Sequence, residues 1–247
     1  MEPRHEKLRL DRFRRIIRAV PLEGPPIFRW IKRAPQGIKK PGRALGVLPS
    51  SFNPPTKAHR ILIEKARDLR PIDEVLLILD KRPLDKEIFG ASLEERLLMI
   101  LLCFQKDSAV SLAFTNRGRF VEKLELIMDA YPKDTLIRFI VGYDTMVRVL
   151  DAKYYENRNA SLTRLFAGSE FLVATRGNAR VDEIRRLALQ RENRPFAEKI
   201  IPLEIPLPHR RLSSTQIRNA IRQRSEIDEF VPSQIKSYLE RSRLYRN

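Results

Sequence analysis

Residues 44–69 of the chain read ALGVLPSSFNPPTKAHRILIEKARDL and contain a short apolar run, a proline-containing turn and an amphipathic stretch. The run at 45–48 predicts a buried strand, and the stretch at 57–69 predicts a helix. Thr56 is then the helix N-cap, and His59 lies in the first turn, where free backbone N–H groups suit an anion. The turn has the features of a phosphate cradle, although a capped helix with an incidental histidine explains this stretch equally well.

The same alternation of strand and helix patterns continues toward the end of the chain. Further strands are predicted at 74–80, 110–114, 136–142, 170–175 and 199–205, the last at a sheet edge. Further helices are predicted at 92–104, 118–131, 179–190, 213–224 and 232–242. Strands that alternate with helices favour a parallel sheet covered on both faces. We therefore expect an α/β fold with a Rossmann-like, doubly wound sheet, C-terminal helices and a functional site at the C-terminal ends of the strands.

Charge divides the chain unevenly. The 247 residues carry a formal charge of +17, and residues 1–43 alone hold thirteen lysines or arginines against four acidic residues. Residues 1–42, which also contain several prolines, predict a basic N-terminal extension, and residues 43–247 predict the folded domain. Such charge favours polyanionic partners, so nucleic-acid binding through the extension stays open beside the plainer interpretation of a solvated basic surface.

Cysteine content and hydropathy narrow the class of protein. The single cysteine, Cys103, lies in an apolar run and is predicted to be a buried thiol, so a disulfide framework and cysteine-rich zinc sites are excluded. No apolar run approaches the roughly 20 residues of a membrane span, and no leader-like segment is visible. We therefore expect a cytoplasmic protein without a membrane span, and we leave homo-oligomer formation open.

A second polar motif, RLSSTQIR, occupies residues 211–218. Ser213 or Ser214 is expected to cap a helix, and Ser214, Thr215 and Arg218 then share one face at its N-terminus. Hydroxyls, free N–H groups and a guanidinium meet on such a face, and a guanidinium is suited to bidentate phosphate binding. A second anion-binding helix start is hard to explain by packing alone, so this motif favours the phosphate interpretation of the first.

Together the two motifs resemble the signatures of the nucleotidyltransferase superfamily, and most closely those of the nicotinamide/nicotinate mononucleotide adenylyltransferases. The first family signature, roughly G-S-F-N-P-[PI]-[HT]-x-x-H, corresponds to residues 50–59, and the second, [IL]-S-S-T-x-I-R, matches residues 212–218 at every fixed position. Weaker agreement extends over most of 44–245. One departure is that Pro49 and Ser50 stand where the family usually has glycine, which gives Ser50 a side chain where the backbone approaches the ligand.

The resemblance implies roles for particular residues. His59, Arg218 and Lys86 would contact the phosphates of ATP and serve the catalytic step. The other residues implied to bind ATP or the dinucleotide are Ser51, Phe52, Thr56, Gly142, Asp144, Arg176, Ser214, Thr215 and Ile217. Those implied to flank the mononucleotide are Phe120, Tyr155 and its neighbour Tyr154. No carboxylate cluster stands out as a metal site, so Mg²⁺ would be held by the phosphates and water.

We therefore expect an adenylyltransferase, in which the 5′-phosphate of nicotinamide mononucleotide attacks the α-phosphorus of ATP in line and NAD and pyrophosphate are formed. Nicotinate mononucleotide, or an acceptor of the cytidylyltransferase or pantetheine-phosphate branches, is the alternative substrate. The sequence contains no P-loop and no G-x-G-x-x-G pattern. An alternative of another class is a nucleotide- or nucleic-acid-binding regulatory protein with a residual site, which the basic extension motivates.

Overall fold

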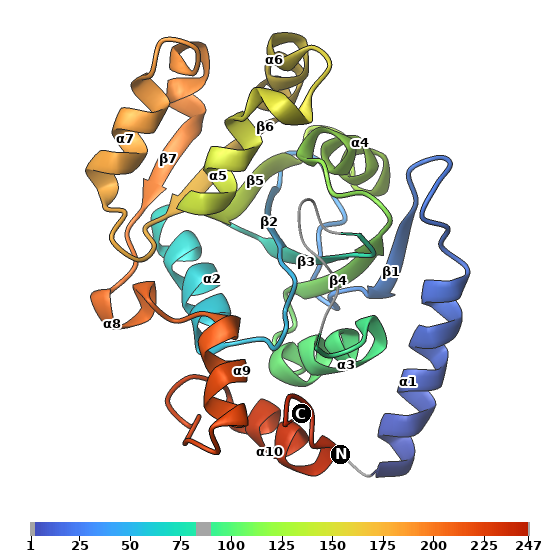
Figure 1. The fold of residues 1–247 in the computed structure, drawn as a ribbon. Helices are drawn as coiled ribbons and strands as arrows, with labels where there is room; N and C mark the ends of the chain where they lie inside the picture. The colour runs from blue at the N-terminus through green and yellow to red at the C-terminus, as the bar shows by residue number, and fades with distance from the viewer. Residues whose placement is uncertain (1–2, 83–89, 247) are drawn as a thin grey trace.

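The computed structural model describes residues 3–82 and 90–246, and in this part of the chain a seven-stranded sheet forms the centre of the fold (Figure 1). The strands are β1 (Phe28–Lys32), β2 (Ala44–Pro49), β3 (Glu74–Asp80), β4 (Val110–Thr115), β5 (Leu136–Gly142), β6 (Ser169–Ala174) and β7 (Ile200–Leu203). The helices are α1 (Pro3–Arg18), α2 (Lys57–Leu69), α3 (Leu93–Phe104), α4 (Phe120–Ala130), α5 (Tyr143–Leu150), α6 (Arg158–Gly168), α7 (Val181–Leu189), α8 (Leu207–Arg210), α9 (Ser214–Arg222) and α10 (Ser233–Ser242). Two 3-10 segments, Ala152–Tyr154 and Arg194–Lys199, complete the regular structure of the described residues.

The sheet has the order β1-β4-β3-β2-β5-β6-β7. Its neighbouring strands are parallel except for β1, which runs antiparallel to β4. Without β1, the order of the remaining strands is that of a doubly wound Rossmann-type sheet, and the direction of winding reverses between β2 and β5. The expected fold class is confirmed, and so is the placement of the last strand at a sheet edge. Folds of this kind bind ligands outside the strand ends at the reversal point.

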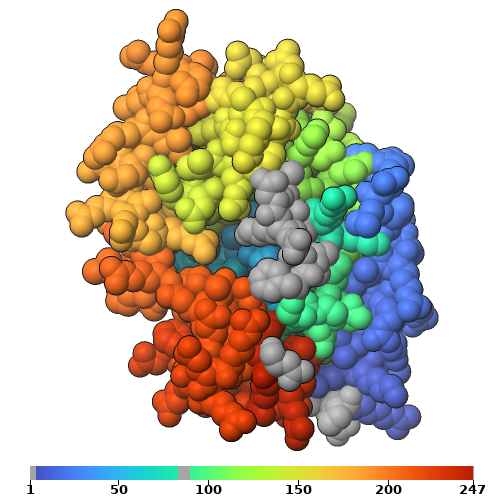
Figure 2. Space-filling view, viewed as in Figure 1, coloured from blue at the N-terminus to red at the C-terminus, as the bar shows by residue number. Residues whose placement is uncertain are grey.

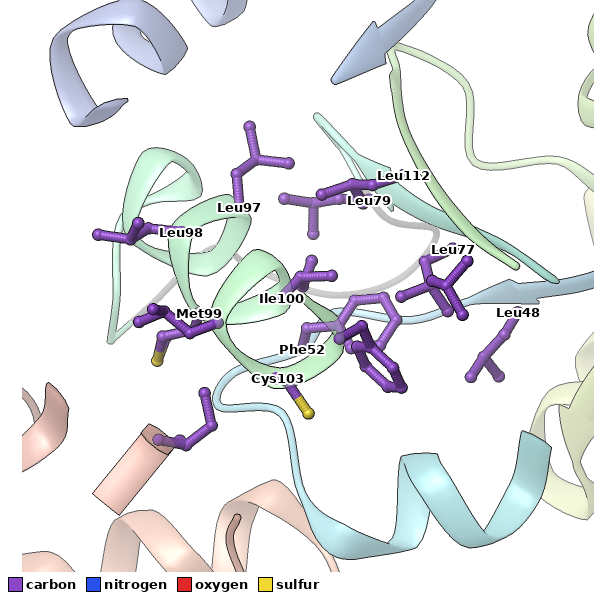
Figure 3. Packing of buried hydrophobic residues seen from close by; sticks show 14 of the residues in the cluster. Leu48, Phe52, Leu77, Leu79, Leu97, Leu98, Met99, Ile100, Cys103 and Leu112 are labelled. Atoms are coloured by element: carbon purple, nitrogen blue, oxygen red, sulfur yellow. The ribbon is translucent and has the colours of Figure 1, made fainter. Parts of the chain in front are cut away.

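Alternation along β3 sends its side chains to two opposite faces of the sheet. Val75, Leu77 and Leu79 enter one hydrophobic cluster, together with residues of α1, α2, α3, α9 and α10. Leu76 and Ile78 enter the other cluster, together with residues of α4, α5, α6 and α7. Figure 3 shows Leu77 and Leu79 on the side of the sheet that α3 covers. A strand buried on both faces reads as a continuous apolar run, which is why this strand is predicted with its correct bounds.

The N-terminal segment differs from the expectation of an extension outside the domain. Strand β1 pairs with β4 from Phe28 opposite Thr115, and α1 lies along α3 (Figure 1). Phe13 and Val20 are buried in the same cluster as the core residues of α3. The sequence does not make this packing evident, because α1 and β1 each bury only one side and carry their basic side chains on the side that faces water. Residues 3–42 therefore belong physically to the folded unit.

Helix α3 has the cap and the buried cysteine that its sequence predicts. Ser92 caps α3 as predicted, since its hydroxyl accepts from the Glu95 N–H and its own N–H donates to the Glu95 carboxylate at 2.7 Å. Cys103 is buried within the apolar side of α3, as predicted. Of the helices described, none has the length and apolar character needed to cross a membrane.

Candidate functional site

The turn after β2 carries the first signature and has an unusual backbone. Phe52 has a φ of 43°, a region that residues other than glycine seldom adopt, and the following Asn53–Pro54 peptide bond is cis. The Phe52 ring is fully buried and lies 4.9 Å, centre to centre, from the ring of His59. Thr56 is the N-cap of α2, as predicted. The turn therefore brings the first helical residues of α2 back toward the end of β2.

The hydrogen bonds of His59 determine which ring nitrogen carries the proton. The Thr56 N–H donates to Nδ1 at 3.0 Å, so Nδ1 is an acceptor and the neutral ring is protonated on Nε2. Nε2 in turn lies 3.1 Å from the hydroxyl of Ser50, which can accept from it. Burial, and secondly the positive charge of Arg176, lower the pKa of His59 to about 4. His59 is thus a neutral N–H donor at neutral pH.

The second signature lies against the first. Of the two candidate caps, Ser213 is the N-cap of α9 and accepts from the Gln216 N–H. The Ser214 hydroxyl donates to the Pro54 carbonyl at 2.9 Å. The guanidinium of Arg218 donates to the Asn53 carbonyl at 2.7 Å and to the Thr215 hydroxyl at 3.0 Å. The two motifs, separated by about 150 residues of sequence, are therefore one structural unit.

A cavity of about 390 Å³, called here the large cavity, lies between these motifs at the point where the sheet reverses. Figure 2 shows the hollow, with atoms of the segment after β2 at its floor, between the yellow-green atoms of α5 and the orange atoms of α8 and α9. Two helix N-termini, those of α2 and α9, border it. The residues predicted to bind ATP or phosphate that line it are Ser51, Thr56, His59, Gly142, Arg176, Ser214, Thr215 and Arg218.

Three predicted residues have other positions, and a fourth cannot be placed. Phe52 and Ile217 are fully buried in the hydrophobic core, so their side chains do not line the cavity. Asp144 is exposed and lies outside the large cavity, where its carboxylate is 3.6 Å from the guanidinium of Arg176. It borders an adjoining shallow hollow instead. Lys86 lies outside the described residues.

A second, smaller cavity of about 90 Å³, called here the small pocket, opens on the other side of the segment 49–51. Phe120, Tyr154 and Tyr155 line it, so the three predicted aromatic residues are together. The Tyr155 hydroxyl donates to the Val149 carbonyl at 2.6 Å, and burial raises the pKa of this phenol to about 12. The ring of Tyr155 is therefore fixed in orientation. A flat group could lie between such aromatic walls.

Sequence reasoning assigned no site role to a buried arginine that lies between the two cavities. Arg96 of α3 lines both of them and is 2% exposed. Its Nε donates to the Ala91 carbonyl at 2.9 Å, while the Ala91 N–H donates to the Asn53 side chain. Asn53 also accepts from the hydroxyl of Tyr245 at 2.6 Å. An arginine inside an apolar helix is the signal that could have identified this position.

Sequence reasoning also missed two charged residues of the small pocket. Asp80, at the end of β3, and Lys123, on α4, both line it and lie 3.0 Å apart. A charged residue at the C-terminal end of an apolar strand is a usable signal for Asp80. Among the described residues, no group of three or more His, Cys, Asp or Glu side chains is arranged to hold a metal ion.

Comparison with known proteins gives consistent results. A family model described as cytidylyltransferase-like matches residues 47–220. A Schizosaccharomyces pombe protein that carries the name nicotinamide mononucleotide adenylyltransferase is 33% identical over 53% of this chain and 52% of its own length, so the match spans about half of that relative. A Listeria innocua protein that carries the name nicotinate-nucleotide adenylyltransferase is 27% identical over 81% of this chain and 96% of its own.

Solved structures show the same fold. The Plasmodium falciparum nicotinic acid mononucleotide adenylyltransferase in complex with NaAD aligns with a TM-score of 0.61 over 82% of this chain and 97% of its own, at 17% identity. A Vibrio parahaemolyticus protein described as a nicotinate-nucleotide adenylyltransferase aligns with a TM-score of 0.51 over 83% and 96%, at 19% identity. At these identities the likeness concerns the fold alone.

Proposed function

The chain belongs to the cytidylyltransferase-like family of nucleotidyltransferases, and on this premise we propose that it transfers AMP from ATP to nicotinamide mononucleotide, forming NAD and pyrophosphate. The observation that carries the proposal is the convergence of the two signatures on one cavity. There the N-termini of α2 and α9, the Nε2–H of His59 and the guanidinium of Arg218 border the same space. Such donors suit a triphosphate.

In this proposal, the donors of the large cavity position the triphosphate and neutralise the charge that develops on it. His59 is neutral and protonated on Nε2, so it can donate one hydrogen bond through this N–H to a phosphate oxygen. Thr215 and Arg218 from the start of α9 would hold the phosphates that leave as pyrophosphate. No side chain needs to act as a nucleophile, because phosphoryl-type transfer requires mainly alignment and charge stabilisation.

The small pocket would hold the acceptor. Its aromatic residues Phe120, Tyr154 and Tyr155 suit the pyridine ring of a mononucleotide. Ser50, Ser51 and Arg96 border both cavities, which supports a position for them where the acceptor phosphate and the α-phosphate of ATP would meet. In-line attack requires the attacking phosphate oxygen to lie next to the α-phosphorus, and a boundary shared by the two cavities allows this. Mg²⁺ would enter with the ATP phosphates, whose oxygens are its preferred ligands.

Nicotinate mononucleotide is the second candidate acceptor, because several relatives carry the name nicotinate-nucleotide adenylyltransferase. The two acceptors differ only in the substituent on the ring, a carboxamide or a carboxylate. Both would use the same phosphate machinery.

The proposal is tested by measuring pyrophosphate release from Mg²⁺-ATP with each mononucleotide in turn, with chromatographic identification of the dinucleotide. We expect release only when an acceptor is present, and we expect the dinucleotide in equal amount. Folded protein that binds ATP but forms no dinucleotide from either acceptor would contradict the proposal.

A further inference from the structure

The wall of the small pocket contains a buried ion pair. Lys123 Nζ lies 3.0 Å from Oδ2 of Asp80, and the Lys123 side chain is 1% exposed. The same ammonium group donates to the Gly118 carbonyl at 2.7 Å. Its charge is also 5.3 Å from the centre of the Phe120 ring, so the pair lies directly beside one of the aromatic walls. The ammonium group is thus occupied by the protein itself.

The other oxygen of this carboxylate has no such partner. Oδ1 of Asp80 is buried and accepts no hydrogen bond from any residue in the described ranges. An unpaired buried carboxylate oxygen is unfavourable, and no residue within 3–82 and 90–246 supplies the donor that such a group calls for. The Asp80 side chain remains 14% exposed, and the residue lines the small pocket. Burial raises the pKa of Asp80 to about 6, while Lys123 opposes that rise, so at neutral pH the carboxylate is mainly charged.

The neighbouring groups restrict what can supply the donor. Phe120 is fixed by edge-to-face packing on Phe139, with ring centres 5.1 Å apart. A flat ring against Phe120 would carry its substituent close to Asp80, because Lys123 lies near both. A substituent with an N–H group would satisfy Oδ1. A carboxylate substituent has no donor and would place a second negative charge beside the first.

Resting on the function proposed above, we propose that Asp80 is the specificity-determining residue of the small pocket, whose Oδ1 accepts a hydrogen bond from the carboxamide of the acceptor and disfavours a carboxylate. The preference for the carboxamide follows from a general property of buried polar groups. A substrate that leaves such a group without a hydrogen bond binds poorly and is rejected. Arg119 and Arg148 also line this pocket and would attract a carboxylate. Arg119 is solvent-exposed and Arg148 is half-buried, so water screens their charges, whereas the Asp80 oxygen is buried.

The test is the ratio of kcat/KM for nicotinamide mononucleotide to that for nicotinate mononucleotide, in the wild type and in Asp80→Asn. Asparagine keeps the shape of the side chain but offers an N–H to a carboxylate. We expect the wild type to prefer the nicotinamide substrate and the variant to shift the ratio toward nicotinate by about tenfold or more. Asp129→Asn, an exposed position on the same helix as Lys123, is the matched control and should leave the ratio unchanged.

The ratio separates specificity from folding, because partial unfolding lowers both values of kcat/KM equally. If Asp80→Asn is too slow to assay, the ratio of the calorimetric Kd values for the two mononucleotides tests the same preference at the level of binding. An unchanged ratio in the variant, or a wild type that prefers nicotinate, would overturn the role of Asp80 and leave the adenylyltransferase function standing. A wild type that forms no dinucleotide with either acceptor would contradict both.

Discussion

The large cavity and the small pocket share the segment 49–51 as a wall, but different parts of the chain complete them. The large cavity is closed by α9, whose Ser214 hydrogen-bonds directly to the turn after β2. The small pocket is lined by the end of β3, by residues that follow β4, and by α5 with the segment after it. The ends of β3 and β4 are held by the N-terminal segment. The Lys81 ammonium group, next to Asp80, donates to the carbonyls of Ile17 and Val20.

The end of β4 is held in the same way. The Asn116 side chain accepts from the Ile27 N–H at 2.8 Å and donates to the carbonyls of Pro21 and Pro25, both at 3.1 Å. These contacts join residues up to 95 positions apart. The proposed phosphate site therefore rests on two short motifs, whereas two strand ends beside the proposed acceptor site are held by an N-terminal segment that carries no motif.

The largest expected effect lies in the large cavity. His59→Ala removes the Nε2–H donor, and we expect kcat to fall about 100- to 1,000-fold with either acceptor, as for other preorganised transition-state donors. The exposed His5→Ala on α1 is the control and should retain wild-type turnover. Steady-state kinetics with ATP and each mononucleotide measure both. Near wild-type turnover of His59→Ala in folded protein would remove the basis for treating the large cavity as the catalytic half.

A smaller effect is expected where the N-terminal segment supports the acceptor side. Asn116→Ala leaves the Ile27 N–H and two proline carbonyls without their partner, which loosens the end of β4 beside Gly118. We expect the KM for the mononucleotide to rise about three- to tenfold while the KM for ATP stays within about twofold. Asn159→Ala, on the exposed side of α6, is the control. Equal increases in both KM values would mean that the N-terminal segment does not act on one cavity only.

A modest gain is expected from Ser50, which stands where related signatures have glycine. Its hydroxyl lies 3.1 Å from His59 Nε2 and accepts the hydrogen bond that Nε2–H would otherwise donate to a phosphate oxygen. Ser50→Gly frees that donor, and we expect kcat/KM for ATP to rise about two- to threefold, the lower end of what one net hydrogen bond contributes. Ser50→Ala should show the same direction. A fall in kcat/KM in both variants would show instead that the hydroxyl takes part in catalysis.

The smallest effect concerns pH. The pKa of His59 is lowered from 6.5 to about 4, so in the free protein the ring stays neutral down to that pH. We expect its proton NMR signals, assigned with His59→Ala, to titrate near pH 4 and not near 6.5. Because the unfolded chain binds this proton at higher pH, His59 should make the free energy of unfolding decrease as the pH falls from about 6.5 to about 4. A midpoint near 6.5 would contradict the burial of the ring.

Much of the fold and half of the site follow from local sequence. The buried strand at 74–80 has a continuous apolar run, and Thr56 and Ser92 are helix caps as their neighbours indicate. By contrast, the strand at 28–32 carries Arg29 and Lys32 on an edge and buries little, so its pattern gives no clear signal. The helices α5 and α6 were also not evident, since the first is short and the second has a polar start.

The rest of the site depends on contacts between side chains that are far apart in the sequence, and the sequence alone does not show these contacts. The sequence marks Asp80 only by its place at the end of an apolar strand, and it does not show that Lys123 lies 3.0 Å from it. Arg96 is similar, because only packing places it between the two cavities. Ile217 is the opposite case: it belongs to a signature predicted to bind phosphate, but its side chain lies in the core and can only position the helix.

The most direct test of the central claim is to follow the α-phosphorus of ATP. Wild-type protein would be incubated with Mg²⁺, nicotinamide mononucleotide and ATP labelled at the α-phosphate, and in parallel with ATP labelled at the γ-phosphate. We predict that the α label appears in a dinucleotide and the γ label in pyrophosphate, in equal amounts. If the α label stays in ATP, or leaves as free AMP with no dinucleotide, the protein does not perform the proposed transfer.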